Sequence, residues 1–305
     1  MSPVKSNLQA VLQAGKFAVT AEAGPPRGVR PEVLRDKARI LKGWVDACNV
    51  TDNQTSVVRL CSLAACKILQ DEGQETVMQM VCRDRNRIAA QSDILGAAAL
   101  GIHNLLCLSG DHQVFGDHPQ AKNVFDIDSI QLLNIATRMR DESKFAGGKD
   151  IDGAPDLFIG ASANPFADPF KIQVPRLAKK VAAGAQFIQT QSIFDLEKFK
   201  EWMNGVRDRG LHEQTAILAG ITPIKSLRMA EYMATNVAGM DVPDAILERM
   251  RGVDKKEQKQ EGIKIAVETI QQLREVEGVR GIHIMAIEWE EAVPEIVQQA
   301  GLVRG

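Results

Sequence analysis

Short apolar segments alternate with longer amphipathic segments along almost the whole chain of 305 residues. The apolar segments have the length and composition of strands that are buried on both faces. Eight strands are predicted, at Phe17–Ala23, Val45–Thr51, Thr76–Cys82, Asn104–Ser109, Leu157–Ser162, Phe187–Gln191, Ala216–Ile221 and Gly281–Ile287. Helices are predicted between and after them, at Pro31–Lys42, Ser56–Gln70, Asn86–Leu100, Ser129–Asp141, Pro169–Ala183, Leu196–Arg209, Ile224–Thr235, Lys255–Glu277 and Glu290–Ala300.

This order of elements predicts an α/β fold, a (β/α)8 TIM barrel that forms a single domain over residues 1–305. A doubly wound open sheet is the alternative. Such a sheet more often has a glycine-rich dinucleotide loop after its first strand, and none is present there. The segment 110–116 has the wrong glycine spacing, and the glycine-rich segment 146–155 reads as a surface loop.

Composition is that of an ordinary soluble globular protein, with 45% hydrophobic and 25% charged residues. The net charge of −2 gives no reason to expect nucleic acid or an anionic membrane as partner. No stretch approaches the roughly 18 apolar residues of a membrane span, and the first residues lack the apolar core of a signal peptide. We therefore expect a cytoplasmic protein.

Neither the cysteines nor the histidines have the spacing of a metal site. The five cysteines fall in apolar strand-like runs or on an apolar helix face, so we expect them to be buried and structural. His112 and His118 lie in a polar loop, where a ligand role is open but solvation is the more common state. No metal is predicted.

The first predicted strand ends in a carboxylate, within the segment Glu22-Ala-Gly-Pro-Pro-Arg-Gly28. A carboxylate at the end of a buried strand is costly unless it is used or paired. The two prolines remove two backbone donors and turn the chain away from the sheet. This arrangement suits a general acid, and Glu22 is the first candidate catalytic residue.

Other polar residues follow the remaining strands, where the active site of a barrel is built. They are Thr51 to Gln54, Ser109 to Asp111, Ser162 to Asn164, Gln189 with Gln191, and Glu288. Cations are few, with Lys180, Arg27 and Arg83 as candidates, so a neutral hydrogen-bonding heterocycle is the expected ligand. Asp52 and Asn53 are equally well explained as helix-cap or turn residues.

Several of these segments occur together, in the same order, in a known family. They are Glu22-Ala-Gly-Pro-Pro-Arg27, Cys48-Asn-Val-Thr51, Leu108-Ser-Gly-Asp111, Lys180-Val-Ala-Ala-Gly-Ala185, Gln189-Thr-Gln191, Phe194-Asp195 and Gly220-Ile-Thr-Pro223. By these motifs the chain resembles the methylenetetrahydrofolate reductases, a flavin-dependent barrel family, over nearly its whole length.

The resemblance implies a role for each matched residue. Glu22 matches the general acid, Asp111 the aspartate beside flavin and pterin, and Gln191 a folate-contacting glutamine. Glu288 is a further substrate-binding candidate. The implied flavin contacts are Thr51, Ser109, Gly110, Asn164 and Lys180. The implied reaction converts 5,10-methylenetetrahydrofolate to 5-methyltetrahydrofolate, through protonation of N10, ring opening and hydride transfer from flavin N5.

Several positions depart from the family pattern. Ser109 replaces an arginine, Asp52 an aromatic residue and Leu227 an aromatic lid residue. Asn164 and Asp168 stand where Tyr and His are usual, and residues 286–289 replace Thr-Leu-Asn-Arg. These changes fall near the adenylate half of FAD or where nicotinamide stacks, so FMN is an alternative to FAD.

The departures also bear on the electron donor. The chain looks like a branch from anaerobic one-carbon pathways, so an iron–sulfur partner subunit is an alternative to NAD(P)H. A homo- or hetero-oligomer is expected. The chain has no cysteine spacing for a cluster of its own.

Two other functions remain open. One is a metal- or Schiff-base-dependent barrel lyase, although no predicted strand contains a lysine and no histidine joins Glu22, Asp111 and Glu288. The other is a flavin- or folate-binding subunit of a larger electron-transfer complex, which would not need an acid at Glu22.

Overall fold

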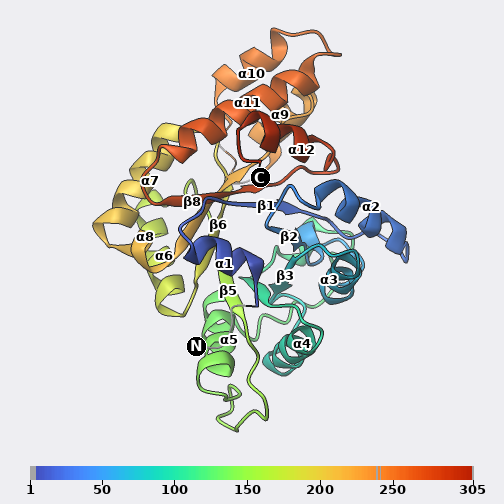
Figure 1. Cartoon of the computed structure of the whole chain (residues 1–305), viewed down its shortest axis with the longest axis vertical. Coiled ribbons are helices and arrows are strands. Elements are labelled where there is room, and N and C mark those ends of the chain that lie inside the picture. Colours follow the sequence, from blue (N-terminus) through green and yellow to red (C-terminus); the bar gives the residue numbers. More distant parts are fainter. Residues whose placement is uncertain (1–4, 238–239, 241, 304–305) are drawn as a thin grey trace.

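The computed structural model describes residues 5–237, 240 and 242–303. Its strands form a closed parallel barrel in which each strand pairs with the next and β8 pairs with β1 (Figure 1). The strands are β1 Ala18–Glu22, β2 Ala47–Val50, β3 Thr76–Val81, β4 Asn104–Leu108, β5 Phe158–Ala163, β6 Phe187–Ser192, β7 Ala216–Ile221 and β8 Val279–Ile284. The predicted TIM barrel is confirmed.

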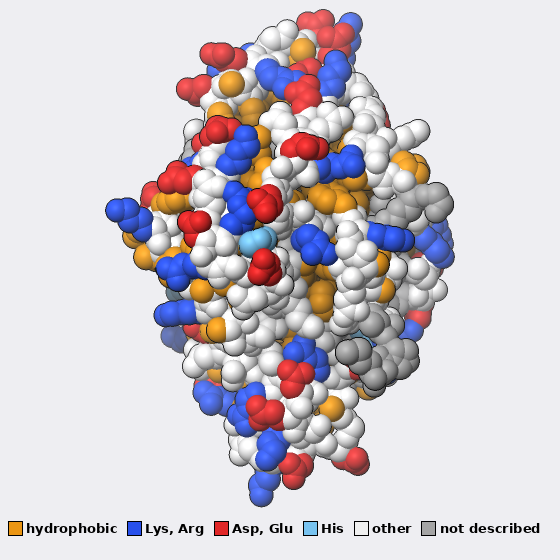
Figure 2. Space-filling view, turned by 60° about the vertical axis from the view of Figure 1, so that its left-hand side comes forward, with side chains coloured by type: hydrophobic (Ala, Val, Ile, Leu, Met, Phe, Trp, Pro, Cys, Tyr) orange, Lys and Arg blue, Asp and Glu red, His pale blue; other side chains and the backbone are white. Residues whose placement is uncertain are grey.

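Helices cover the outside of the barrel (Figure 1). They are α1 Asn7–Gln13, α2 Pro31–Leu41, α3 Ser62–Asp71, α4 Arg87–Ala99, α5 Ser129–Asp141, α6 Gln173–Ala182, α7 Leu196–Asp208, α8 Leu211–Gln214, α9 Leu227–Asn236, α10 Asp244–Arg251, α11 Gln258–Arg274 and α12 Ala292–Gln299. Among the described residues, no helix is long and apolar enough to cross a membrane. Figure 2 shows basic and acidic side chains interspersed over one face, in keeping with the small net charge.

The barrel interior is layered along its axis. At the amino-terminal end, apolar side chains that include Phe158, Phe187 and Leu218 fill it together with residues of α1. Gly160 is required in this layer, because a Cβ there would lie 2.3 Å from the Phe187 ring. Above it the inward side chains become polar, and the carboxyl ends of the strands open into a cavity.

Several predictions about the elements need correction. The short helices α1, α8 and α10 were not predicted. The helix predicted from Ser56 begins only at Ser62, because Thr55 and Ser56 have positive φ angles of 54° and 59°, which no α-helix accepts. The last strand covers Val279–Ile284, so Glu288 lies on the following loop and not at a strand end.

Glu75 fastens α1 across the amino-terminal end of the barrel. Its carboxylate accepts hydrogen bonds from the backbone N–H of Asn7 at 2.6 Å and of Leu8 at 2.9 Å. The same carboxylate accepts from Ser6 Oγ at 3.1 Å and from Asn104 Nδ2 at 2.9 Å. It thus satisfies two backbone donors at the free helix N-terminus while it holds that helix to β4.

Replacing this carboxylate should measurably weaken the fold. We expect Glu75→Gln to lower the free energy of unfolding by about 2 kcal/mol, because charge-assisted bonds are lost and one donor is left unsatisfied. Urea denaturation measures the change, with Glu201→Gln on the exposed face of α7 as control. A loss as small as that of the control would contradict the assigned role of Glu75.

Candidate active site at the barrel mouth

A cavity of about 370 Å³ lies at the carboxyl ends of the strands. Its walls include six of the residues predicted from the sequence, namely Glu22, Ser109, Gly110, Asp111, Lys180 and Gln191. The barrel therefore brings together groups that lie up to 169 residues apart along the chain, counted from position 22 to position 191. This is the place where the fold class puts its active site.

Glu22 is the last residue of β1, and its side chain is 21% exposed at the floor of this cavity. Its neighbour is His283 of β8, whose Nε2 lies 3.8 Å from Glu22 Oε1. The His283 ring is 4% exposed, and its Nδ1 lies 2.9 Å from Thr20 Oγ1. A buried imidazole thus stands between the candidate acid and the polar interior of the barrel.

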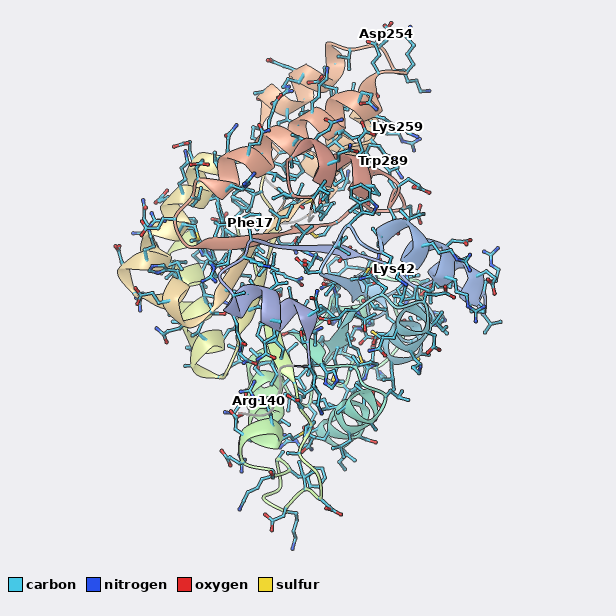
Figure 3. All side chains as sticks on the ribbon, in the orientation of Figure 1. Phe17, Lys42, Arg140, Asp254, Lys259 and Trp289 are labelled. Carbon is cyan, nitrogen blue, oxygen red and sulfur yellow. The ribbon has the colours of Figure 1, made fainter. Side chains whose placement is uncertain are left out.

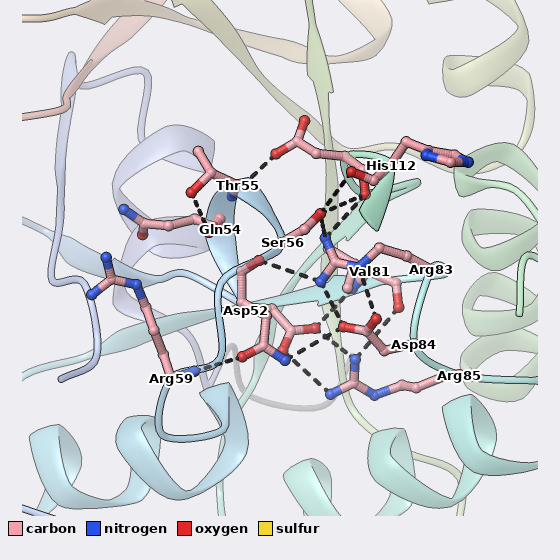
Figure 4. Close-up of polar contacts among 12 residues, drawn as sticks. Asp52, Gln54, Thr55, Ser56, Arg59, Val81, Arg83, Asp84, Arg85 and His112 are labelled. Atoms are coloured by element: carbon pink, nitrogen blue, oxygen red, sulfur yellow. Dashed lines mark hydrogen bonds and ion pairs between the residues drawn. The ribbon is translucent and has the colours of Figure 1, made fainter. Parts of the chain in front are cut away.

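The loop after β2 is held to the loops after β3 and β4 by a network of ionic contacts (Figure 4). Asp52 is buried, accepts from Val81 N at 3.0 Å and pairs with Arg85 at 2.6 Å. It serves the structure in this way and not as a helix cap. Arg83 donates to Ser56 Oγ at 2.8 Å and to the backbone oxygen of Asp111 at 3.1 Å.

Asp111 stands at the rim of the cavity and is exposed. Its carboxylate accepts from the backbone N–H of Thr55 at 3.2 Å, which links the loops after β2 and β4 (Figure 4). Gly110 precedes it with a φ of +90°, and a Cβ at this position would lie 2.9 Å from Val81 Cβ. Glycine is therefore needed where the chain passes the end of β3.

Lys180 supplies a half-buried cation beside β5, the strand next to β4. Its Nζ donates to the backbone oxygen of Ser162 at 2.5 Å. Burial, together with the positive charge of Arg176, lowers the pKa of Lys180 to about 8. Lys180 and Arg176 also line a smaller adjoining cavity of about 160 Å³. Asn164 and Gln191 are among the other residues that line it. An anionic group placed there would stabilise the charged lysine.

Three further predicted flavin contacts lie just after strand ends. Ser109 is exposed beside the main cavity, and its Oγ accepts from Ser129 N at 3.3 Å. Thr51 is buried at the end of β2, and its Oγ1 has no hydrogen-bond partner among the described residues. Asn164 Oδ1 accepts from Phe166 N at 2.9 Å, so its side chain already closes a turn.

Glu288 does not line the main cavity, in contrast to its expected place among the strand ends. It is exposed on the loop after β8 and lines a second cavity of about 590 Å³ beside residues 24–27. Glu22 borders both cavities. The next residue, Trp289, lies under the ammonium group of Lys259 of α11, whose Nζ is 5.9 Å from the ring centroid (Figure 3).

The charge of the main cavity differs from expectation. Arg83, Arg176 and Lys180 line it together with Glu22, Asp52 and Asp111, so it is not poor in cations. Arg27 pairs with Asp117 at 2.6 Å at the rim of the second cavity. Arg176 could not be identified from the sequence pattern, because one arginine on an amphipathic helix resembles any solvated residue.

His283 is the functional candidate that sequence reasoning missed. It lies within an apolar strand, where a lone histidine reads as part of the core, but one signal was available. In a parallel barrel β8 pairs with β1, and the register sets His283 beside Thr20, two residues before Glu22. Closure of the barrel therefore places it next to the strand-end acid.

The cysteine and histidine expectations have mixed outcomes. Cys48, Cys66, Cys82 and Cys107 are buried as predicted, but Cys61 is exposed at the start of α3. His112 and His118 are exposed in the loop after β4. Over the described ranges, no group of three or more His, Cys, Asp and Glu side chains could hold a metal ion.

The lowered pKa of Lys180 predicts a pH-dependent contribution to stability. Between about pH 8 and pH 10 the unfolded chain still holds the lysine proton, whose ordinary pKa is about 10.4, and the folded chain has lost it. Stability therefore rises with pH over this window. Lys180→Met should remove that rise.

Urea denaturation at pH 7.5 and pH 9.5 measures this contribution. We expect the wild type to gain more than about 1 kcal/mol relative to Lys180→Met between the two values. Lys179→Met, at the neighbouring exposed position of the same helix, is the control and should show no such difference. Parallel behaviour of wild type and Lys180→Met would refute the buried cation.

Known proteins are similar in sequence to this chain over most of its length. A probable methylenetetrahydrofolate reductase (NADPH) of Caenorhabditis elegans is 25% identical over 289 residues, covering 91% of this chain and 41% of that protein. Methylenetetrahydrofolate reductase (NADH) 1 of Arabidopsis thaliana is 24% identical, covering 98% of this chain and 51% of that protein. The chain thus spans about half, or less, of the length of these curated relatives.

Solved structures share the fold. An uncharacterized protein from Clostridium thermocellum that binds two copies of 5-methyl-5,6,7,8-tetrahydrofolic acid superposes with a TM-score of 0.63. Its sequence identity is 13%, over 97% of this chain and 96% of that one. A 2,3-dimethylmalate lyase superposes with a TM-score of 0.51 at 12% identity, over 92% of this chain and 79% of that one.

The family model described as methylenetetrahydrofolate reductase matches residues 7–301. This match runs from α1 to Gly301, the second residue after α12, so it includes every strand of the barrel and the loops that form the mouth cavity. The chain belongs to the methylenetetrahydrofolate reductase family.

Proposed function

We propose that this chain reduces 5,10-methylenetetrahydrofolate to 5-methyltetrahydrofolate with a bound flavin. The observation that most supports the proposal is the position of Glu22. It is the acid matched to the family's proton donor, and it lies on the floor of the mouth cavity beside a buried histidine. Family membership and the names of the curated relatives support the same reaction.

Glu22 would deliver a proton to N10 of the folate. The C–N10 bond of the five-membered ring then breaks, its electron pair stays on N10, and the exocyclic methylene remains as a 5-iminium cation. That cation accepts hydride and becomes the methyl group. A strand-end carboxylate suits this step because the barrel holds it rigidly, and proton transfer depends on correct geometry.

Asp111 and Gln191 would orient the pterin, the first from the loop after β4 and the second from β6. Both side chains line the cavity and are exposed to it, so they are available to a bound heterocycle. The Asp111 carboxylate would also stabilise the iminium charge once the ligand has displaced water from it. Glu288 would meet the substrate only from the second cavity.

The residues of the mouth fit a flavin. When bound, reduced flavin supplies the hydride. Thr51 has a buried hydroxyl without a partner, and Lys180 provides a cation with donors to spare beside Arg176. Ser109, Gly110 and Asn164 complete the proposed contacts. FAD follows from the family, and FMN is the alternative because serine replaces the family's arginine at position 109.

Two electron donors for the flavin are considered, a nicotinamide and an iron–sulfur partner subunit. Relatives are named for NADPH and for NADH, which supports a nicotinamide donor. Leu227 in place of an aromatic lid residue favours the alternative, an iron–sulfur partner subunit in a hetero-oligomer. Anaerobic reduction of the flavin with NADH, NADPH and a low-potential one-electron donor in parallel distinguishes these donors.

The cofactor can be identified directly. We expect the purified protein to be yellow, and chromatography of the extracted cofactor should give FAD or FMN. FAD at full occupancy would exclude the FMN alternative. A colourless protein that contains a stoichiometric metal would instead favour a barrel lyase and contradict the proposed function.

Substitution of Glu22 tests the acid. Glu22→Gln should retain flavin and bind 5-methyltetrahydrofolate, while the rate of folate reduction falls by a factor of about 10² to 10⁴ because the proton donor is lost. The matched control is Glu291→Gln, an exposed residue beside α12. Unchanged folate turnover in Glu22→Gln would remove this residue from the mechanism.

A further inference from the structure

A closed network of polar side chains fills the barrel directly below Glu22. Asn49 Nδ2 donates to Gln189 Oε1 at 2.6 Å, and Gln189 Nε2 donates to Asn49 Oδ1 at 3.0 Å. The same Gln189 amide nitrogen lies 3.2 Å from Thr20 Oγ1 and 3.4 Å from His283 Nδ1. His283 completes the network through its contact with Thr20. All four side chains are buried, so each donor needs an acceptor within the network.

The contacts of Thr20 bear on which nitrogen of His283 carries the proton. Thr20 has one hydroxyl proton, and the backbone oxygen of Ile282 accepts it at 3.2 Å. In this arrangement Thr20 Oγ1 accepts from Gln189 Nε2 and from His283 Nδ1, and the longer 3.4 Å approach of Gln189 Nε2 to His283 Nδ1 brings two donors together and is no hydrogen bond. A neutral His283 then has its proton on Nδ1. Its Nε2 presents a lone pair toward Glu22 at 3.8 Å.

We infer that Glu22 and His283 act as one proton-holding pair, in which the Thr20–Asn49–Gln189 network fixes the histidine tautomer. This inference rests on the proposed function, because it explains how Glu22 serves as an acid. An isolated glutamic acid is ionised at neutral pH and has no proton to give.

The pair holds one proton in addition to that on Nδ1. This proton resides on Nε2 as an imidazolium–carboxylate pair or on Glu22 as a carboxylic acid beside a neutral imidazole, and the two forms exchange across one contact. When N10 takes the proton from Glu22, the pair passes from net charge zero to −1. The proton returns from solvent through the mouth cavity, which both side chains line.

His283 is thus a positioning residue that acts through Glu22. Arg83, Arg176, Lys180, Asp52 and Asp111 also line the cavity, but no ion pair joins any of them to Glu22 or His283 within the described part of the chain. Among the described residues, His283 is therefore the titratable side chain that the ionic contacts pair with Glu22.

The tautomer can be measured without any turnover. Nitrogen NMR of protein labelled with ¹⁵N-histidine, with His283 assigned from the His283→Asn spectrum, should show a protonated Nδ1. Glu22→Gln should shift the Nε2 signal and leave the Nδ1 signal in place. A neutral His283 that carries its proton on Nε2, or an Nε2 signal insensitive to Glu22→Gln, would overturn the inference.

Kinetics provide the second test. His283→Asn keeps a donor near the position of Nδ1 for Thr20 but removes Nε2. We expect it to slow hydride transfer to methylenetetrahydrofolate about ten-fold or more, with flavin content, 5-methyltetrahydrofolate binding and dithionite reduction of the flavin unchanged. His103→Asn, at the opposite end of the barrel, is the matched control.

Thr20→Val separates the tautomer from the imidazole itself. It leaves His283 in place but removes the acceptor of the Nδ1 proton, so both tautomers should appear in the nitrogen spectrum and folate reduction should again slow. Equal loss in the flavin and folate half-reactions, or no loss in either, would contradict a role through Glu22. Failure of the wild type to reduce folate at all would defeat the proposed function, while the NMR result would still decide the tautomer.

Discussion

Closure of the barrel by the pairing of β8 with β1 is the constraint on which the site depends. The register sets His283 opposite Thr20 and leaves Glu22 one inward position higher, at the floor of the mouth. These residues are separated by more than 260 positions in sequence, from Thr20 to His283, and no local interaction could bring them together. Closure of the sheet brings them together, because the last strand then pairs with the first.

The same closure divides the interior into layers with different tasks. Phe158 and Phe187 stack with their ring centroids 4.9 Å apart and fill the amino-terminal end below the polar network. That apolar layer lies in the part of the barrel covered by α1. Inward polar groups above it satisfy one another, as buried polar groups must, and at the mouth the polar groups become available to ligands.

Sequence patterns predicted the barrel because buried parallel strands are nearly continuous apolar runs, and all eight were located within a few residues. Glu22, Asp111 and Gln191 line one cavity, as expected from the sequence, because strand ends meet at one edge of the sheet. Glu288 was misplaced because the apolar run continues past the last ladder bond of β8 into a loop. Arg176 was missed because only tertiary packing brings it to the cavity. His283 was missed because its place near Glu22 follows from the register of β8 with β1 and not from the local pattern of its own strand.

The central claim is that hydride passes from bound flavin to methylenetetrahydrofolate at the mouth of this barrel. A single-turnover experiment tests it most directly, in which the anaerobically reduced holoprotein is mixed with methylenetetrahydrofolate and flavin absorbance is followed. The account predicts reoxidation of the flavin with one equivalent of 5-methyltetrahydrofolate formed per flavin. A flavin that stays reduced in the presence of saturating substrate, with no methyl product, would contradict the account.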